Sequence, residues 1–385
     1  MTQAAPRIVI TGVGAFTPLG DSPSALWQCL VGGDSAVREW PDLLSAGYRC
    51  ARACRIDTFD AEPLRRGRAL AIAAAEQAVF AAGIELPPRR TGVFIGSTLG
   101  ESEAFERAAQ GADIDVAGFG VASFGDGIRA RFGLHRPSES LATACAAGNY
   151  AVGAALAALR ASRIDVALSG GAEPFSRLAM VGFSRSRAMA SDACRPFDAR
   201  RSGMLLGEGA AMFVLERADA ALRRGALPLA EVVALGLSCD AHHPTAPKPD
   251  GSGMRAAMQA ALDAAAVSAA QVDWVNAHGT GTRASDAAEA MALRDLFGPL
   301  LPPVSASKGA LGHALGAAAA IELAICIEGL RAQTVPPTAG HEQPDPDGGL
   351  ACTRAATPTR LRWVMNNAFA FGGLNSALLL RAWEL

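Results

Sequence analysis

A cysteine near the middle of this sequence has a setting in which its sulfur could act as a nucleophile. Cys145 lies where a short apolar run, residues 140–144, passes into an Ala-rich segment with a helical pattern. A thiol in the first turn of a helix lies near unpaired backbone N–H groups and the positive end of the helix dipole, and both favour the thiolate. Taken alone, a cysteine is more often a small buried hydrophobe. The case for a nucleophile therefore depends on other residues.

Two of the six histidines, His278 and His313, lie in glycine-rich segments directly after apolar runs. Functional side chains in parallel α/β sheets gather at the carboxyl ends of strands, so these histidines and Cys145 could converge. Lys308 lies in the second segment, although the chain has only one other lysine. Its retention indicates that a compact, titratable ammonium matters there. Glu322, in the following apolar helix, is its candidate buried counter-charge.

Alternating strand and helix patterns predict how these residues are positioned. Apolar runs predict strands at residues 8–13, 92–97, 140–144, 165–171, 210–215, 229–238, 273–277, 304–307, 363–368 and 377–380. Helical patterns fall at residues 22–30, 65–82, 102–109, 119–132, 145–161, 253–266, 285–297 and 312–331. Strands separated by helices predict an α/β fold with parallel sheets covered on both faces. Because the order of elements is used twice, we expect two similar halves, residues 1–220 with the cysteine and 221–385 with the histidines.

Composition excludes several classes of protein. Half of the 385 residues are hydrophobic, and the formal net charge of −2 offers no general basic field for nucleic acid. Eight cysteines without paired spacing predict a reducing, cytoplasmic setting. We find neither a leader pattern nor an uninterrupted apolar stretch of membrane-spanning length, so no membrane insertion is expected.

Four ordered motifs resemble the signatures of the β-ketoacyl-acyl carrier protein synthases, most closely the elongating enzymes of type II fatty acid and polyketide synthesis. They are ACAAG at 144–148, NAHGTGT at 276–282, KGALGH at 308–313 and FAFGGLN at 369–375. The likeness runs from Ile8 to near Leu380 and includes RPFD at 195–198 and GEG at 207–209. It implies a thiolase-like fold with five layers, α-β-α-β-α, built from two similar halves.

The resemblance also implies roles for the candidate residues. Cys145 would take an acyl group from a carrier-protein thioester. His278 and His313 would promote decarboxylation of malonyl-carrier protein and stabilise the enolate oxygen, with Lys308 orienting His313. The N–H groups of Cys145 and Phe371 would form the oxyanion hole, and Phe371 would also be the gate beside the cysteine.

Substrate contacts follow from the same motifs. Thr280 and Thr282 would hydrogen-bond the phosphopantetheine arm on which the carrier protein holds the substrate, and no further cofactor or metal is implied. Phe369, Gly372 and Asn375 are candidate substrate-binding residues of the gate motif.

Three arginines at the start of a predicted helix are candidates for holding the acidic acyl carrier protein. Arg65, Arg66 and Arg68 could equally be a solvated helix end, but cations oppose the dipole at a helix N-terminus, which favours another use. The family is usually dimeric, so the other expected partner is a homologous subunit, in a homodimer or a heterodimer.

The gate motif departs from the family pattern at three positions. Ala368, Ala370 and Leu374 stand where elongating enzymes often have Ser, Gly and Thr. Since alanine lacks the access of glycine to positive φ, we expect a less mobile gate.

Other readings remain open. A non-catalytic partner subunit, such as a chain-length factor, typically lacks the cysteine, and a thiolase would carry a second cysteine within residues 366–376, which have none. A metal site from Cys239, His242 and His243 lacks a closing ligand set. The repeat at 279–282 lacks the lysine of a phosphate-binding loop. Acyl length, the starter unit, the product class and the choice between homodimer and heterodimer are left undetermined.

Overall fold

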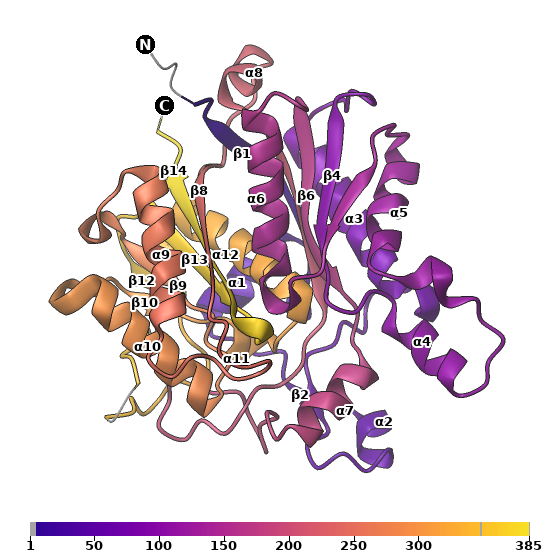
Figure 1. Cartoon of the computed structure of the whole chain (residues 1–385), viewed down its shortest axis with the longest axis vertical. Helices are drawn as coiled ribbons and strands as arrows, with labels where there is room; N and C mark the ends of the chain where they lie inside the picture. The colour runs from indigo at the N-terminus through magenta and orange to yellow at the C-terminus, as the bar shows by residue number, and fades with distance from the viewer. Residues whose placement is uncertain (1–4, 347–348, 385) are drawn as a thin grey trace.

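Ten strands form one mixed sheet in the computed structural model, which describes residues 5–346 and 349–384 (Figure 1). In sheet order they are β10 (Val304–Ser305), β9 (Trp274–Asn276), β13 (Trp363–Phe369), β14 (Leu374–Ala382), β8 (Ala230–Cys239), β1 (Ile8–Phe16), β7 (Gly209–Arg217), β6 (Val166–Glu173), β4 (Thr91–Gly96) and β5 (Ser138–Leu141). Two short pairs lie outside it: β2 (Arg38–Glu39) with β3 (Arg52–Ala53), and β11 (Thr334–Val335) with β12 (Thr357–Pro358).

The two halves of the sheet repeat one topology. Numbered along the chain within each half, both sets of five strands lie in the order 3-2-4-5-1. In both, strands 3, 2 and 4 are mutually parallel, and strand 5 is antiparallel to its two neighbours. β1 and β8, the first strand of each half, pair antiparallel and join the halves. The prediction of two similar α/β halves is therefore confirmed.

The prediction of wholly parallel sheets is wrong. Parallel neighbours need a crossover connection, commonly a helix, whereas antiparallel neighbours can be joined by a tight turn. Residues 370–373 connect β13 to β14 in such a turn, so these strands form a hairpin. Both β7 and β14 run antiparallel to the strands beside them.

Helices cover both faces of each half-sheet and complete five layers. The outer layers are α3 (Arg66–Ala82) with α5 (Ala122–Phe132), and α9 (Ser252–Ala265) with α10 (Arg283–Phe297); the middle layer is α6 (Ala147–Arg160) with α12 (Ala318–Ala332). In Figure 1, α6 stands at the centre, with α3 and α5 on one side and α9 and α10 on the other. Strand residues alternate between layers: Val275 packs outward and Trp274 inward. Burial on both faces explains why the strands read as continuous apolar runs.

Shorter helices complete the chain. They are α1 (Pro23–Gly32), α2 (Pro41–Ser45), α4 (Ser102–Ala109), α7 (Arg177–Arg185), α8 (Ala218–Arg223) and α11 (Lys308–Leu311). Within the described residues, no helix has the length and apolar character needed to cross a bilayer.

The predicted helix at 312–331 is broken near its start, and the break repeats a turn found in the first half. Leu315 has a φ of +44° and opens a 3₁₀ turn, Leu315–Ala317, before α12. Ala144 has a φ of +47° and opens the 3₁₀ turn Ala144–Ala146 before α6. Within this repeated turn, Cys145 and Gly316 occupy equivalent positions. The break leaves His313 outside any helix, at the edge where strands end.

Candidate active site

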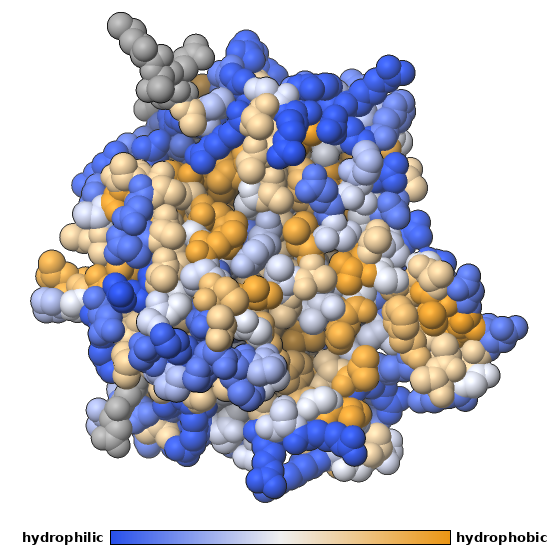
Figure 2. Space-filling view, in the orientation of Figure 1, coloured by the Kyte–Doolittle hydropathy of each residue, from blue (hydrophilic) through white to orange (hydrophobic). Residues whose placement is uncertain are grey.

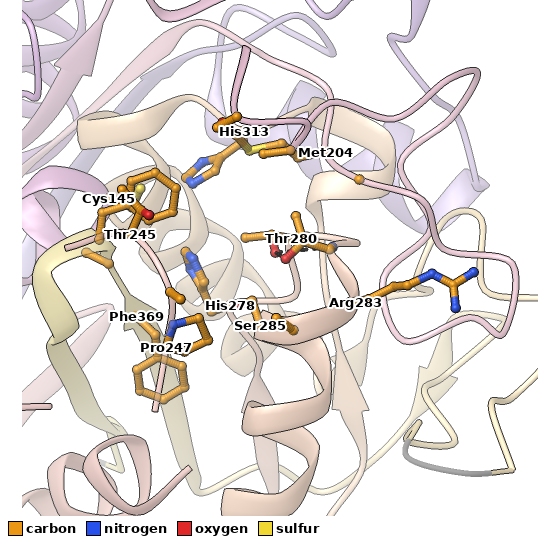
Figure 3. Close-up of a pocket in the computed structure, with 18 of the residues that line it drawn as sticks. Cys145, Met204, Thr245, Pro247, His278, Thr280, Arg283, Ser285, His313 and Phe369 are labelled. Carbon is orange, nitrogen blue, oxygen red and sulfur yellow. Dashed lines mark hydrogen bonds between the residues drawn. The ribbon is translucent and has the colours of Figure 1, made fainter. Parts of the chain in front are cut away.

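A pocket of ≈ 380 Å³ lies where the two halves meet, and its wall includes Cys145, His278 and His313 (Figure 3). Cys145 comes from the turn before α6, His278 from the loop after β9, and His313 from the break before α12. The repeated topology thus brings side chains that are far apart in sequence to one cavity. Cys145 contributes the only cysteine sulfur among the described residues that line it.

The sulfur of Cys145 is nearly buried, with 8% of the residue exposed. Burial raises the pKa of the thiol to about 12; the charge of Lys308 opposes this rise and that of Glu173 adds to it. The sequence predicted a favoured thiolate from the helix end, but the desolvation that raises the pKa of the thiol outweighs that effect. The resting residue is therefore a thiol, whose proton must leave as the sulfur reacts.

Both histidines present a ring proton to the pocket. Their ring centroids lie 5.4 Å apart. His313 Nδ1 accepts the Leu315 N–H at 3.2 Å, and His278 Nδ1 lies 3.4 Å from Lys308 Nζ, which as an ammonium can only donate. Burial, followed by the charge of Lys308, lowers the pKa of both rings well below the usual value. Each ring is therefore neutral, with its proton on Nε2.

Lys308 contacts His278 directly, whereas the resemblance implied that it orients His313. Its ammonium donates to the His278 carbonyl oxygen at 2.6 Å and to Glu322 Oε1 at 2.5 Å. Both side chains of this ion pair are almost fully buried. Lys308 is the first residue of α11, which directs it beneath the end of β9 and toward α12, where Glu322 lies. Glu322 is thus the counter-charge that the sequence indicated, and the pair fixes the orientation of His278.

The loop that carries Thr280 and Thr282 is held by two carboxylates that sequence reasoning missed. Glu289 of α10 accepts the N–H groups of His278 and Gly279 at 2.8 and 2.9 Å. Asp286 accepts the Gly281 N–H at 3.1 Å. The two threonine hydroxyls lie 2.9 Å apart in the pocket wall. Small glycines and these carboxylates therefore fix the hydroxyls at the cavity.

The gate motif faces the same cavity. Phe369, Phe371 and Asn375 line it, and the Phe371 ring lies 5.6 Å from that of Phe183 on α7. Gly372 is not in the wall; it has a φ of +78° and donates its N–H to Pro244 at 2.8 Å. The gate is thereby tied to the loop at 240–247.

The alanine at position 370 causes no local backbone conflict, because its φ is −112°. The positive φ values of this turn fall instead on Gly372 and Gly373. Asn375 Nδ2 donates to Asp240 Oδ1 at 2.7 Å and to Ser238 at 3.2 Å, which joins β14 to the 240–247 loop. The expectation of a less mobile gate stays a prediction.

The arginines at the start of α3 do not share one environment, and none lines the pocket. Arg66 turns inward, pairs with buried Glu208 at 2.9 Å and donates to the carbonyls of Ile56 and Phe59. Its assignment to the carrier protein is therefore corrected to a structural one. Arg65 stacks on Phe119, with its guanidinium carbon 4.6 Å from the ring centroid. The stem of Arg68 lies against Gly127 on α5.

Glu101 explains how α3 tolerates these cations at its N-terminus. Its buried carboxylate accepts the N–H groups of Gly67 and Arg68 at 3.0 and 2.6 Å. Burial raises its pKa to about 7, against the lowering effect of these bonds. A carboxylate at this end of a helix offsets the dipole.

Other residues at the site were not foreseen. Glu173, at the end of β6, accepts the N–H groups of Thr98, Leu99 and Gly316, and so ties the loop after β4 to the turn before α12. The pocket wall also includes residues that no motif indicated, among them Phe183, Arg187, Met204 and Arg283. Of these four residues, only Arg283 could have been found from the sequence, since it directly follows the NAHGTGT motif.

No group of three or more ligating side chains is placed to hold a metal ion within the part of the chain that the structure describes. Cys239, His242 and His243 therefore form no such group. The absence of a cofactor stays a prediction.

Comparisons with known proteins agree with one another over nearly the whole chain. Models of the β-ketoacyl synthase N-terminal and C-terminal domains match residues 5–221 and 229–342. Nodulation protein E of Rhizobium meliloti (strain 1021) is 35% identical, covering 97% of this chain and 99% of the relative. The 3-oxoacyl-(acyl-carrier-protein) synthase 2 of the same strain is 34% identical, covering 97% and 98%. The solved ishigamide ketosynthase/chain length factor superimposes with a TM-score of 0.92 at 36% identity, covering 99% of this chain and all of that one.

Proposed function

The chain belongs to the β-ketoacyl synthase family, and from this premise we propose that it is a 3-oxoacyl-acyl carrier protein synthase. In this reaction an acyl group held on the enzyme is joined, by decarboxylative Claisen condensation, to malonyl-acyl carrier protein. The observation that carries the proposal is one cavity lined by a thiol and two neutral imidazoles. The proposed reaction lengthens the acyl chain in fatty acid or type II polyketide synthesis.

The first step is thioester exchange at Cys145. The sulfur attacks the acyl carbonyl carbon, the bond to the pantetheine sulfur breaks, and the thiol proton ends on that departing sulfur. Negative charge on the carbonyl oxygen needs fixed donors. Cys145 and Phe371 lie in the first turns of 3₁₀ segments, where N–H groups lack a partner within the turn, so these two groups suit an oxyanion hole.

The second step uses the imidazoles. Loss of CO₂ from malonyl-carrier protein leaves an enolate, whose oxygen accepts the Nε2 protons of His278 and His313 as hydrogen bonds. The enolate carbon attacks the acyl carbon on Cys145, and the carbon–sulfur bond breaks. The products are CO₂, 3-oxoacyl-carrier protein and, after the sulfur takes a proton, the free thiol.

The proposal includes two partners. Acyl carrier protein delivers both substrates on phosphopantetheine, with no further cofactor, and a homologous subunit, identical or different, completes the enzyme. Support for the subunit comes from exposed apolar side chains on α4 and α7: Phe105, Leu178 and Val181. Figure 2 shows apolar residues at the surface over α4. A purely non-catalytic role is disfavoured because the thiol and both histidines share the pocket.

We also propose the cytoplasm as the compartment, since all eight cysteines are free thiols. Residues 1–220 and 221–385 are the proposed halves, and each contributes side chains to the pocket.

Mass spectrometry tests the function directly. With a series of acyl-carrier proteins, the peptide that contains Cys145 is expected to gain the mass of the acyl group. Adding malonyl-carrier protein should then remove that mass and yield the 3-oxoacyl product. If no chain length modifies the protein, either alone or mixed with a homologous subunit, the proposed function is wrong.

Charge reversal at α3 tests the carrier-binding proposal. Arg65→Glu with Arg68→Glu is expected to raise the KM for acyl-carrier protein by about tenfold, with kcat within about twofold, because charges at an interface act mainly on encounter. Arg66→Glu is the matched comparison, because it makes the same charge reversal at an arginine that supports the fold. It places a carboxylate against buried Glu208 and should lower the free energy of unfolding by about 3–5 kcal/mol. An unchanged KM in the double variant would remove the assignment.

A further inference from the structure

A second cavity, of ≈ 400 Å³, lies at the end of the sheet away from Cys145. We call it the terminal cavity, because its wall is formed by the residues just before β8 and β13, the end of α12, and the end of β14 with the residues that follow. β13 and β14 run between this wall and the gate turn at 370–373. In Figure 1 the C-terminus marks the cavity end of β14, and the gate turn lies at the other end. Among the described residues, the two cavities share no part of their walls.

Three arginines and one carboxylate give the terminal cavity its charge. Arg331 pairs with Glu328 at 2.8 Å, and Arg362 pairs with Glu384 at 3.4 Å. The third arginine, Arg360, is exposed, and its guanidinium has no ion-pair or hydrogen-bond partner within the described residues. One positive charge in the wall is therefore left without a counter-charge in this part of the chain.

The hydrogen-bonding groups of the wall are unequally satisfied. Gln333 Nε2 donates to the carbonyl oxygens of Leu330 and Leu361 at 2.7 and 2.9 Å, so these acceptors are already occupied. By contrast, the indole N–H of Trp383 is buried and has no acceptor in the chain as described. A buried donor without a partner costs free energy, which favours a ligand that can accept from it. The wall thus lacks an acceptor, not a donor.

Apolar side chains complete the wall. Leu330 and Leu361 are almost fully buried, and Leu229 packs against the same core cluster. The Trp383 ring is covered by Arg7, whose guanidinium carbon lies 4.2 Å from the ring centroid. A ligand that fills this space therefore needs an apolar part as well as a charge, and the volume is in the range of sites for small organic molecules.

We propose that the terminal cavity binds an organic monoanion, a carboxylate with a short apolar tail. The carboxylate pairs with Arg360, since guanidinium and carboxylate groups match in charge and geometry, and it brings the acceptor that the Trp383 N–H lacks. Its single charge equals the one that the wall leaves uncompensated, whereas a phosphate monoester would bring nearly two. The tail lies against Leu229 and Leu361. The proposal does not depend on the reaction proposed for Cys145.

Calorimetric titration of the purified chain with octanoate tests the proposal. We expect octanoate to bind, and octanol and inorganic phosphate to bind about tenfold more weakly or less, because each lacks one half of the ligand. Arg360→Gln should weaken octanoate binding by about tenfold. Trp383→Phe, which keeps an aromatic ring but removes the N–H, should weaken it by about threefold. Arg255→Gln, an exposed arginine of α9 outside both walls, is the matched control and should bind octanoate as the wild type does.

Each outcome decides the proposal. Because the Arg360 guanidinium has no partner within the described chain, Arg360→Gln should keep the melting temperature of the wild type. A wild type that does not bind octanoate, or an affinity that Arg360→Gln leaves unchanged, overturns the site. Equal binding of octanol would remove the role of the charge, and tighter binding of phosphate would remove that of the apolar wall. None of these results bears on acylation of Cys145, so the proposed function would stand in every case.

Discussion

Replacing Cys145 by alanine is expected to abolish acylation and to slow condensation by on the order of 10⁴-fold or more, since no second thiol in the described pocket wall can accept the acyl group. The change is small and the site is buried, so the fold should survive. Product formation from acyl- and malonyl-carrier protein is the measurement, with intact mass as the check on acylation. Cys239→Ala, which removes an exposed thiol outside the pocket, is the control and should react as the wild type does.

The same variant separates the two half-reactions. Because the histidines and their tautomers do not depend on the sulfur, Cys145→Ala should still release CO₂ from malonyl-carrier protein. Condensation at the wild-type rate by this variant would end the case for the thiol as the acyl acceptor.

The second large effect is expected at the imidazoles, with the opposite pattern. His313→Ala and His278→Ala should each lower decarboxylation and condensation by about 10²- to 10³-fold, because each removes a fixed donor to the enolate oxygen. Acylation of Cys145 should fall far less. His313→Asn retains an N–H donor and should recover part of the rate. Normal CO₂ release by both alanine variants would contradict the role of these rings.

The pH dependence gives a second readout for the histidines. Their pKa values are lowered by burial and by Lys308, so the neutral, Nε2-protonated form persists as the pH falls through the usual histidine range. Decarboxylation should therefore hold its rate at pH 6 and fall only well below pH 6.5. A loss of rate centred at or above pH 6.5 would show that the rings titrate as exposed histidines do.

Local sequence patterns were sufficient to find the elements near the site, because they depend on short-range features. The apolar run before Cys145, the Ala-rich helix after it and the glycine-rich segments around His278 and His313 each lie within one stretch of chain. Strand direction was not readable in this way. β13 and β14 run antiparallel because residues 370–373 close a tight turn between them. The number and order of predicted strands and helices do not reveal this turn.

Contacts between distant segments account for the remaining errors. Lys308 is five positions from His313 but lies against His278, because α11 directs it toward the end of β9. Arg66 resembles its neighbours in sequence, yet only it reaches Glu208, 142 residues away. Phe183 and Met204 enter the pocket from the connection between β6 and β7, where no periodic pattern marks them.

The repeated turn before α6 and α12 has a consequence for the symmetry of the chain. A β-carbon at Gly316 would lie 2.5 Å from the Thr98 nitrogen and 2.6 Å from Ser97. No side chain fits there unless the loop that Glu173 holds moves aside. The position in the second half that matches Cys145 is thus closed off by backbone of the first half. The duplicated fold therefore has room for a single reaction centre.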